Sequence, residues 1–144
     1  MVGRGLLRTV LILGLGTSLV TGLVACEGGY VASGSRESSR ISGQGGWVES
    51  RIRSANGSAT QGIELDGSGL RLDTEVTLEV EEGTFTIELL DGEGNVTLTL
   101  RATPGNPASG RGYMEVDFDE AQYRVTAEEA KGVYYRMDFA FVSE

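Results

Sequence analysis

The chain has 144 residues, 40% of them hydrophobic, so it is large and apolar enough for one folded domain and is not expected to be disordered throughout. Its 12 basic and 21 acidic residues give a formal net charge of −9, and such a surface repels phosphate backbones, which argues against a nucleic-acid partner. Histidine is absent from the sequence, so the commonest general base and the commonest metal ligand are both missing.

The N-terminal segment has the pattern of a signal peptide. Arg4 and Arg8 supply positive charge, and the run 10–24 that follows is apolar or small and carries no charge. As a helix this run would span roughly 22 Å, which is shorter than the hydrocarbon core of about 30 Å. The sequence therefore favours a signal peptide over residues 1–25 rather than a stable membrane span.

The apolar run ends in Leu23-Val24-Ala25-Cys26, and Cys26 is the only cysteine. These four residues resemble the lipobox of bacterial lipoproteins, in which the cysteine receives a diacylglycerol, the chain is cut just before it, and the new N-terminus is often acylated as well. The resemblance implies lipidation of Cys26 and anchoring to the bacterial cell membrane, inner or outer, with the domain on the extracytoplasmic side. Two acyl chains suffice for stable anchoring. The alternative is an ordinary signal peptide that leaves Cys26 as a free thiol.

Residues 26–46 are rich in Gly and Ser with scattered charge, a composition typical of a flexible linker. We expect the lipidated cysteine to be followed by a tether over this range. Tyr30, Val31 and Ile41 are its sizeable apolar residues and are interpreted as incidental. The folded domain is predicted over residues 47–144.

From Trp47 onward, apolar and polar residues alternate with a period of two, which indicates half-buried antiparallel strands. Strands are expected over 75–82, 84–90, 96–101 and 113–119, in a short segment around 123–125, and over 133–142, with two fainter ones near 47–54 and 61–72. In 113–119, Met114, Val116 and Phe118 are assigned to the buried face. The pattern predicts an all-β fold, an antiparallel β-sandwich of about 7–8 strands, with a small barrel as the alternative.

Gly-containing turns separate these strands at 66–69, 82–83 and 91–94. The segment 103–112 is expected to be a long loop, and 127–132 a connection between the last two strands. The stretches VTLEVEEGTFTIELLDGEGNVTL and YRVTAEEAKGVYYRMDF also resemble a loose class of secreted bacterial β-sandwich modules, many of them uncharacterised lipoproteins or accessory domains. This resemblance implies the fold and no functional residue.

Glu115, Asp117 and Asp119 are candidate metal ligands. If 113–119 is one strand, their side chains share a face about 7 Å apart, and carboxylates are the ligands that calcium prefers. The Asp-Gly-x-Gly turns at 66–69 and 91–94 could add oxygen atoms. The alternative is a solvated acidic face with ordinary turns, because no EF-hand spacing is present.

Trp47, Tyr113 and Tyr134 are candidate ligand contacts. Tyr113 and Tyr134 are out of phase with the buried side of their strands, so they are expected on the surface, where aromatic rings can stack on sugars or contact a protein. Exposed tyrosines without a ligand, and Trp47 as a cap on the core, are the alternatives.

Catalysis is not expected. Without histidine no serine has its usual base, and a small sandwich with short turns offers little wall for a substrate cleft. The sequence predicts a non-catalytic binding or interaction module at the cell envelope, with an envelope protein or a polysaccharide as partner. The alternative is a structural or accessory subunit without a small ligand. No cofactor is expected beyond the diacylglycerol on Cys26, with calcium left open.

Overall fold

The computed structural model describes residues 29–65 and 70–142; the predicted signal peptide, Cys26 and the turn at 66–69 lie outside this part. Within it the regular elements are strands: β1 (Val31–Ser33), β2 (Arg36–Ile41), β3 (Gly45–Glu64), β4 (Arg71–Glu79), β5 (Glu82–Leu90), β6 (Val96–Ala102), β7 (Ala108–Glu115) and β8 (Glu120–Val142). Nothing in the described ranges forms a helix with the length and hydropathy needed to cross a bilayer.

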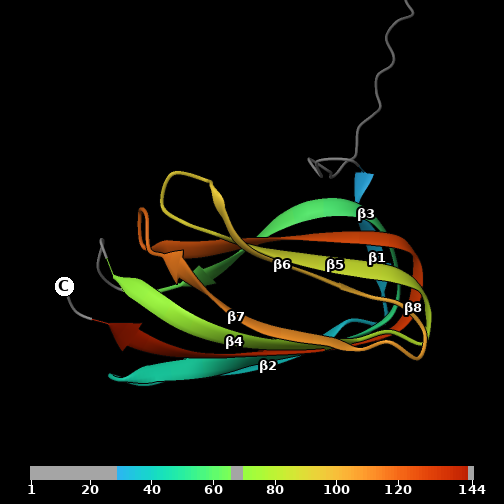
Figure 1. Cartoon of the computed structure of the whole chain (residues 1–144), viewed down its shortest axis with the longest axis horizontal. Coiled ribbons are helices and arrows are strands. Elements are labelled where there is room, and N and C mark those ends of the chain that lie inside the picture. The colour runs from blue at the N-terminus through green and yellow to red at the C-terminus, as the bar shows by residue number, and fades with distance from the viewer. Residues whose placement is uncertain (1–28, 66–69, 143–144) are drawn as a thin grey trace, which may run out of the picture.

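The strands form one antiparallel sheet that folds over itself into two layers (Figure 1). The long strands β3 and β8 pair along almost their whole length and run through both layers. In the first layer β2 pairs with the start of β3, β4 pairs with the end of β8, and β7 pairs with β4. In the second layer β5 pairs with the start of β8, and β6 pairs with β5. The predicted antiparallel β-sandwich is therefore confirmed.

The two layers meet where β3, β8 and β5 bend together. The register of β3 on β8 shifts between Ala55 and Gly57, and β5 shifts on β8 between Glu82 and Thr84. Bulges of this kind increase local twist and let a strand turn a corner. Gly83 has φ 76°, and a Cβ there would collide with the backbone carbonyls of Glu128 and Glu129, so only glycine fits.

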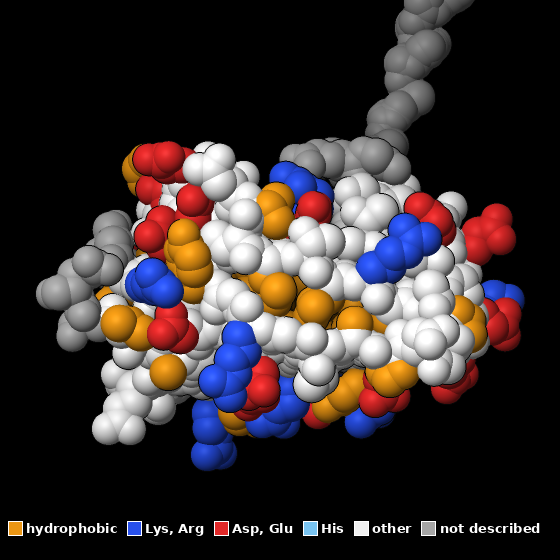
Figure 2. All heavy atoms as spheres, in the orientation of Figure 1, with side chains coloured by type: hydrophobic (Ala, Val, Ile, Leu, Met, Phe, Trp, Pro, Cys, Tyr) orange, Lys and Arg blue, Asp and Glu red, His pale blue; other side chains and the backbone are white. Residues whose placement is uncertain are grey.

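The core lies between the layers and is built from the alternating positions that the sequence pattern marks. Its largest fully buried side chains are Tyr123, Phe85, Leu72, Leu78, Ile87, Leu89, Met114, Met137, Val76 and Val125. Hydrophobic side chains also lie along the line where the layers meet on the face seen in Figure 2. Because each strand alternates, its other side chains face solvent, and the outer faces of both layers are polar.

The expected tether at 26–46 is wrong for two stretches. β1 pairs with residues 54–56 of β3, and β2 pairs with residues 46–51, so both belong to the sheet. Tyr30 packs against the core rather than being incidental, and its neighbour Ala32 packs there as well. The composition hid these strands because β2 is exposed along its length and is held by backbone hydrogen bonds, which require no hydrophobic pattern.

Three expected interruptions are also corrected. The separate strands near 47–54 and 61–72 are replaced by the single strand β3 and the start of β4, and the strands at 123–125 and 133–142 are one strand, β8. The segment 127–132 is the bend of β8, not a connection, and Glu129 with φ 48° and Gly132 with φ 62° allow it. In the segment expected as a loop, β7 already begins at Ala108.

A further correction concerns 113–119. β7 ends at Glu115, and 117–120 is a tight turn in which the N–H of Asp117 donates to the carbonyl of Glu120 at 2.8 Å. Phe118 lies at the tip of this turn and is 88% exposed, so its assignment to the core is wrong. The alternation continues through Val116, which is buried, and stops where the backbone reverses.

Candidate ligand-binding face

The outer face of the first layer brings together all three aromatic residues proposed from the sequence. Trp47 on β3 lies between Arg40 on β2 and Asp138 on β8, whereas Tyr113 on β7 lies opposite Asp73 on β4. Tyr134 on β8 lies opposite Arg51. All three rings are partly exposed, as their phase in the strands predicts.

The same face carries a large share of the chain's arginines, which alternate with acidic residues. Its outward arginines are Arg36, Arg40, Arg51, Arg71, Arg111 and Arg136. We call this surface, with its three aromatic rings, the arginine–aromatic face. Basic side chains line the lower edge of the molecule in Figure 2, on the side where β2, β4 and β7 lie in Figure 1. The face is therefore much less acidic than the chain as a whole.

Each aromatic ring has a guanidinium group over it. Arg71 lies 4.1 Å from the centroid of Tyr113, and Arg51 lies 4.5 Å from that of Tyr134. Arg136 lies 4.6 Å from the ring of Trp47. Such cation–π contacts contribute about 0.5–1 kcal/mol each at exposed sites, and they favour the stacked arrangement of ring and guanidinium group.

Carboxylates orient two of these arginines. The Arg71 Nε donates to Asp73 Oδ1 at 2.9 Å, and the Arg136 Nε lies 3.1 Å from Asp138 Oδ2. The Tyr134 hydroxyl donates to Glu49 Oε2 at 2.8 Å, and this hydrogen bond to a carboxylate raises the pKa of Tyr134 above its ordinary value. Exposed ion pairs add little to stability. These contacts therefore contribute mainly to the arrangement of the side chains on this face.

A hollow of about 700 Å³ lies on this face across β8, β4 and β7. We call it the face hollow. Its wall includes Tyr113, and its polar groups are Arg71, Asp73, Glu75, Arg111, Asp138 and the hydroxyl of Thr97. Ala140 and Gly112 lie among them and leave the space open because their side chains are small or absent. The volume is in the range typical of small-molecule sites.

Tyr113 lies at the edge of the face hollow, where both its backbone and its ring make contacts. The N–H of Tyr113 donates to the Thr97 hydroxyl at 3.2 Å, which joins β7 to β6 where no strand ladder connects them. Its ring is fixed by Arg71 from the neighbouring strand. The backbone bond fixes the position of Tyr113 on β7, and the guanidinium group favours one orientation of its ring, which lowers the cost of ordering the ring when a ligand arrives.

The three aromatic candidates differ in their position relative to the face hollow. Tyr113 lines the face hollow, Trp47 is the cross-strand neighbour of its residue Asp138, and Tyr134 is outside it. Arg71 and Arg111 were missed by sequence reasoning. Their signal was present, because both stand at the polar phase of an alternating strand, but the polar phase alone does not separate a binding residue from a solubilising one.

The three candidate metal ligands do not share a strand face. Glu115 ends β7, and its carboxylate accepts the N–H of Gly92 at 3.0 Å, whereas Asp117 and Asp119 belong to the turn beyond it. Asp91 of the second expected calcium turn accepts the N–H groups of Glu93 and Asn95. Across 29–65 and 70–142, no three acidic, histidine or cysteine side chains are grouped so as to hold a metal ion.

Comparisons with known proteins leave the family open. No family model matches the sequence, and no curated protein matches it significantly. Among solved structures, a carbohydrate-binding module of Cellvibrio mixtus lichenase 5A, solved with cellotriose, matches with 14% identity and a TM-score of 0.37, covering 78% of this chain and 91% of that one.

The TmCBM61 module, solved with β-1,4-galactotriose, matches with 18% identity and a TM-score of 0.38, covering 78% of this chain and 90% of that chain. The xylan-binding CBM22-1 domain of Paenibacillus barcinonensis Xyn10C matches with 14% identity and a TM-score of 0.35, covering 82% and 96%. TM-scores this low give these structures no weight in assigning function, which is considered below from this chain's own residues.

Proposed function

We propose that this chain is a lipid-anchored, extracytoplasmic binding module that binds a polysaccharide in the face hollow. The observation that carries the proposal is the face hollow itself: an open depression with guanidinium and carboxylate groups from neighbouring strands around it and one fixed tyrosine ring in its wall. Concave sites with a few placed polar groups are the usual form of ligand sites.

The chemistry of the face hollow suits sugar hydroxyls. A hydroxyl both donates and accepts hydrogen bonds, and here acceptors such as Asp73 and Glu75 stand next to donors such as Arg71 and Arg111. The ring of Tyr113 offers an apolar surface for the C–H side of a sugar. Arg71 is paired with Asp73 at 2.9 Å, and Arg111 lies 3.7 Å from Glu75, so donors and acceptors alternate around the face hollow.

Hydrolysis fits this geometry less well than binding. A glycosidase uses two carboxyl groups across the scissile bond, and its acid lies in an apolar, partly closed pocket. The carboxylates of the face hollow are open to solvent, with 54% of the Asp73 side chain and 55% of the Glu75 side chain exposed. We therefore propose binding without catalysis.

Calorimetric titration of the full chain in nonionic detergent tests the proposal. The ligands are soluble neutral and uronic-acid oligosaccharides and soluble peptidoglycan fragments. We expect saturable binding of one class, weakened about 30-fold by Tyr113→Ala, since a central contact contributes about 2 kcal/mol. Tyr134→Ala is the matched control, because it removes an aromatic ring from the same face outside the face hollow.

Equal losses from Tyr113→Ala and Tyr134→Ala would contradict the face hollow as the site. Absence of binding across the whole panel would favour the second candidate, an accessory subunit of an envelope complex. One observation supports that candidate: tryptophan, tyrosine and arginine, which are combined on this face, are enriched at protein-binding hot spots. In that case crosslinking in intact cells should join the face to a single protein.

Anchoring through Cys26 is part of the same proposal. It rests on the Leu-Val-Ala-Cys sequence at 23–26, which lies outside the described residues. The polysaccharide would then belong to the envelope that surrounds the anchored domain.

A further inference from the structure

The arginines of the arginine–aromatic face fall into two groups. Those on β4, β7 and β8 each have a carboxylate oxygen 2.9–3.7 Å away. Those on β2 and β3 form no ion pair with any residue that the structure describes, and neither does the neighbouring Arg53 of β3. We call this second group the basic strip; its members are Arg36, Arg40, Arg51 and Arg53. It stands out in a chain whose formal net charge is −9.

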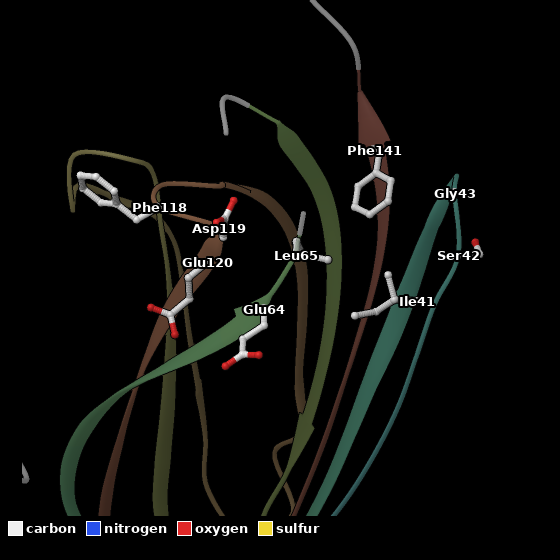
Figure 3. A pocket seen from close by; sticks show the side chains of 9 residues that line it. All are labelled: Ile41, Ser42, Gly43, Glu64, Leu65, Phe118, Asp119, Glu120 and Phe141. Atoms are coloured by element: carbon white, nitrogen blue, oxygen red, sulfur yellow. The ribbon is translucent and has the colours of Figure 1, made fainter. Parts of the chain in front are cut away.

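The strand register places the basic strip on the outer side of the sheet. Arg36 is the direct cross-strand partner of Arg51, and Arg40 is that of Trp47, and side chains directly opposite each other share a side. Ile41, the next residue of β2, points instead into a separate hollow at the end of the sandwich (Figure 3). Because successive side chains of a strand alternate, Arg36 and Arg40 both point outward.

Three of these arginines line one hollow of about 660 Å³ beside the bend of the sheet. Arg51 and Arg53 are alternate residues of β3, so they share its outer side about 7 Å apart. The Arg53 guanidinium group lies over Gly34, close to the start of β2 at Arg36: a Cβ built on Gly34 would be 3.3 Å from its Cζ. The acidic residues of this hollow come from 79–81, on the other side of β8.

The fold gives no reason for this arrangement. Like charges directly opposite each other destabilise a sheet, and Arg36 faces Arg51 in this way. Charges on an edge strand can prevent aggregation, which would account for Arg36 and Arg40 on β2. They would not account for Arg51 and Arg53, because β3 is an inner strand with neighbours on both sides.

The arginines of the strip can bind an anion as they stand. Arg51 lies over the ring of Tyr134, but a cation–π contact uses the flat face of the guanidinium group and leaves the N–H groups at its edge able to donate. A carboxylate accepts two such N–H bonds from one arginine. A ligand with several carboxylate groups therefore complements the strip.

The basic strip is continuous with the face hollow. One cross-strand row runs from β2 to β7 and consists of Arg40, Trp47, Asp138, Glu75 and Arg111. The last three of these residues line the face hollow. Five neighbouring strands span about 19 Å, so an extended chain of sugars laid along this row contacts both the face hollow and the strip.

We propose that the polysaccharide bound by this chain is acidic. Sugar carboxylates bind the basic strip while another part of the same glycan occupies the face hollow. This inference rests on the proposed function, because the face hollow supplies the remaining contacts to the glycan. A neutral glycan would leave the charges of the strip unused, and an acidic peptide would have no use for the face hollow.

Calorimetric titration of the full chain in nonionic detergent tests this, with oligomers of galacturonic, glucuronic and mannuronic acid and the methyl ester of each as probes. Esterification removes the charge and keeps the sugar backbone. We expect at least one acid to bind about tenfold more tightly than its ester, because hydrogen bonds to charged groups are stronger than those to neutral ones.

Paired substitutions locate the charge effect. Arg36→Gln with Arg40→Gln should weaken binding of the acid about tenfold and leave binding of the ester within twofold. The matched control is Arg101→Gln with Lys131→Gln, which removes the same charge from exposed positions outside the strip and should leave both within twofold. Thermal melting should show the Arg36 and Arg40 variant no less stable than the unaltered chain, because the repulsion between Arg36 and Arg51 is relieved.

Failure of this inference differs from failure of the proposed function. Equal binding of acid and ester, both weakened by Tyr113→Ala, would overturn the acidic ligand and keep the face hollow as the glycan site. Acid binding that Tyr113→Ala leaves unchanged would overturn both. Binding of no oligomer, an equal loss in the control variant, a lowered melting temperature in the Arg36 and Arg40 variant, or displacement of the acid by polyglutamate at equal charge would also overturn the inference.

Discussion

At the scale of single residues, the core contains a pair of buried tyrosines that touch through their hydroxyls. The oxygens of Tyr123 and Tyr135 are 3.0 Å apart, and the two side chains are 2% and 3% exposed. The Tyr135 hydroxyl is also hydrogen-bonded to the buried Ser50. Because buried hydroxyls need partners, these three side chains satisfy one another across the core.

This network predicts which of two conservative substitutions lowers the free energy of unfolding more. Tyr135→Phe removes the hydroxyl common to Tyr123 and Ser50, leaves both without that partner, and should lower the free energy of unfolding by about 1–3 kcal/mol. Tyr123→Phe leaves the bond between Tyr135 and Ser50 and should cost less. Urea denaturation of both variants measures the difference, and a larger loss in Tyr123→Phe would contradict the network.

The same tyrosines predict the response to alkaline pH. Burial raises the pKa of Tyr30 from 10.0 to about 12 and raises the pKa values of Tyr123 and Tyr135 as well. A raised folded-state pKa means that the stabilisation is complete below pH 10 and is lost as the pH rises toward and through 12. Unfolding followed by circular dichroism together with phenolate absorbance should show this loss.

The control for that titration is a chain with Tyr123→Phe, Tyr135→Phe and Tyr30→Phe. It should lose much less stability between pH 10 and pH 12, whatever its stability at neutral pH. An equally steep loss in the triple variant would assign the alkaline unfolding to other groups.

At the scale of elements, β3 and β8 organise the molecule, because each crosses from one layer into the other. Their length allows β1 and β2 to pair with β3 although neither carries a hydrophobic pattern. The N-terminal stretch before Trp47 is thus structural from Val31 onward, apart from its turns.

A truncation tests this role. A chain that starts at residue 42 lacks β1, β2 and the Tyr30 packing, whereas one that starts at residue 29 retains them. We expect the shorter chain to be less stable by about 1–3 kcal/mol, the contribution of one large buried side chain, and to aggregate through the exposed edge of β3. Thermal melting with light scattering compares the two chains. Identical behaviour would mean that β1 and β2 do not stabilise the domain and would support the tether predicted over 26–46.

At the scale of the whole molecule, the prediction concerns attachment. Cys26→Ser removes the only residue that the lipobox resemblance assigns to lipid, so the chain should move from the membrane fraction to the soluble extracytoplasmic fraction. Mass spectrometry of the unaltered chain should find diacylglycerol on a new N-terminal Cys26. Retention of Cys26→Ser in membranes would instead support the apolar run 10–24 as a membrane span.

Much of the fold could be predicted from the sequence, because alternation with a period of two is a local property. Val76, Leu78, Phe85 and Ile87 are buried as their phase requires, and Tyr113 and Tyr134 are partly exposed for the same reason. The prediction failed where the alternating pattern is absent from a strand or continues beyond the end of one. β2 has no apolar stripe, and at Phe118 the alternation ran on into a turn set by two positive φ angles.

The sequence by itself thus determined the all-β class, the strand phases and the expectation of a signal peptide and a lipidated Cys26. Only the tertiary structure decided which strands share a layer, and therefore which side chains meet. Arg71 covers Tyr113 because β4 and β7 are neighbours, and Glu64 faces Glu120 because β3 and β8 pair to their ends. The face hollow joins segments far apart in the chain, and strand pairing over such distances depends on the packing of the whole core.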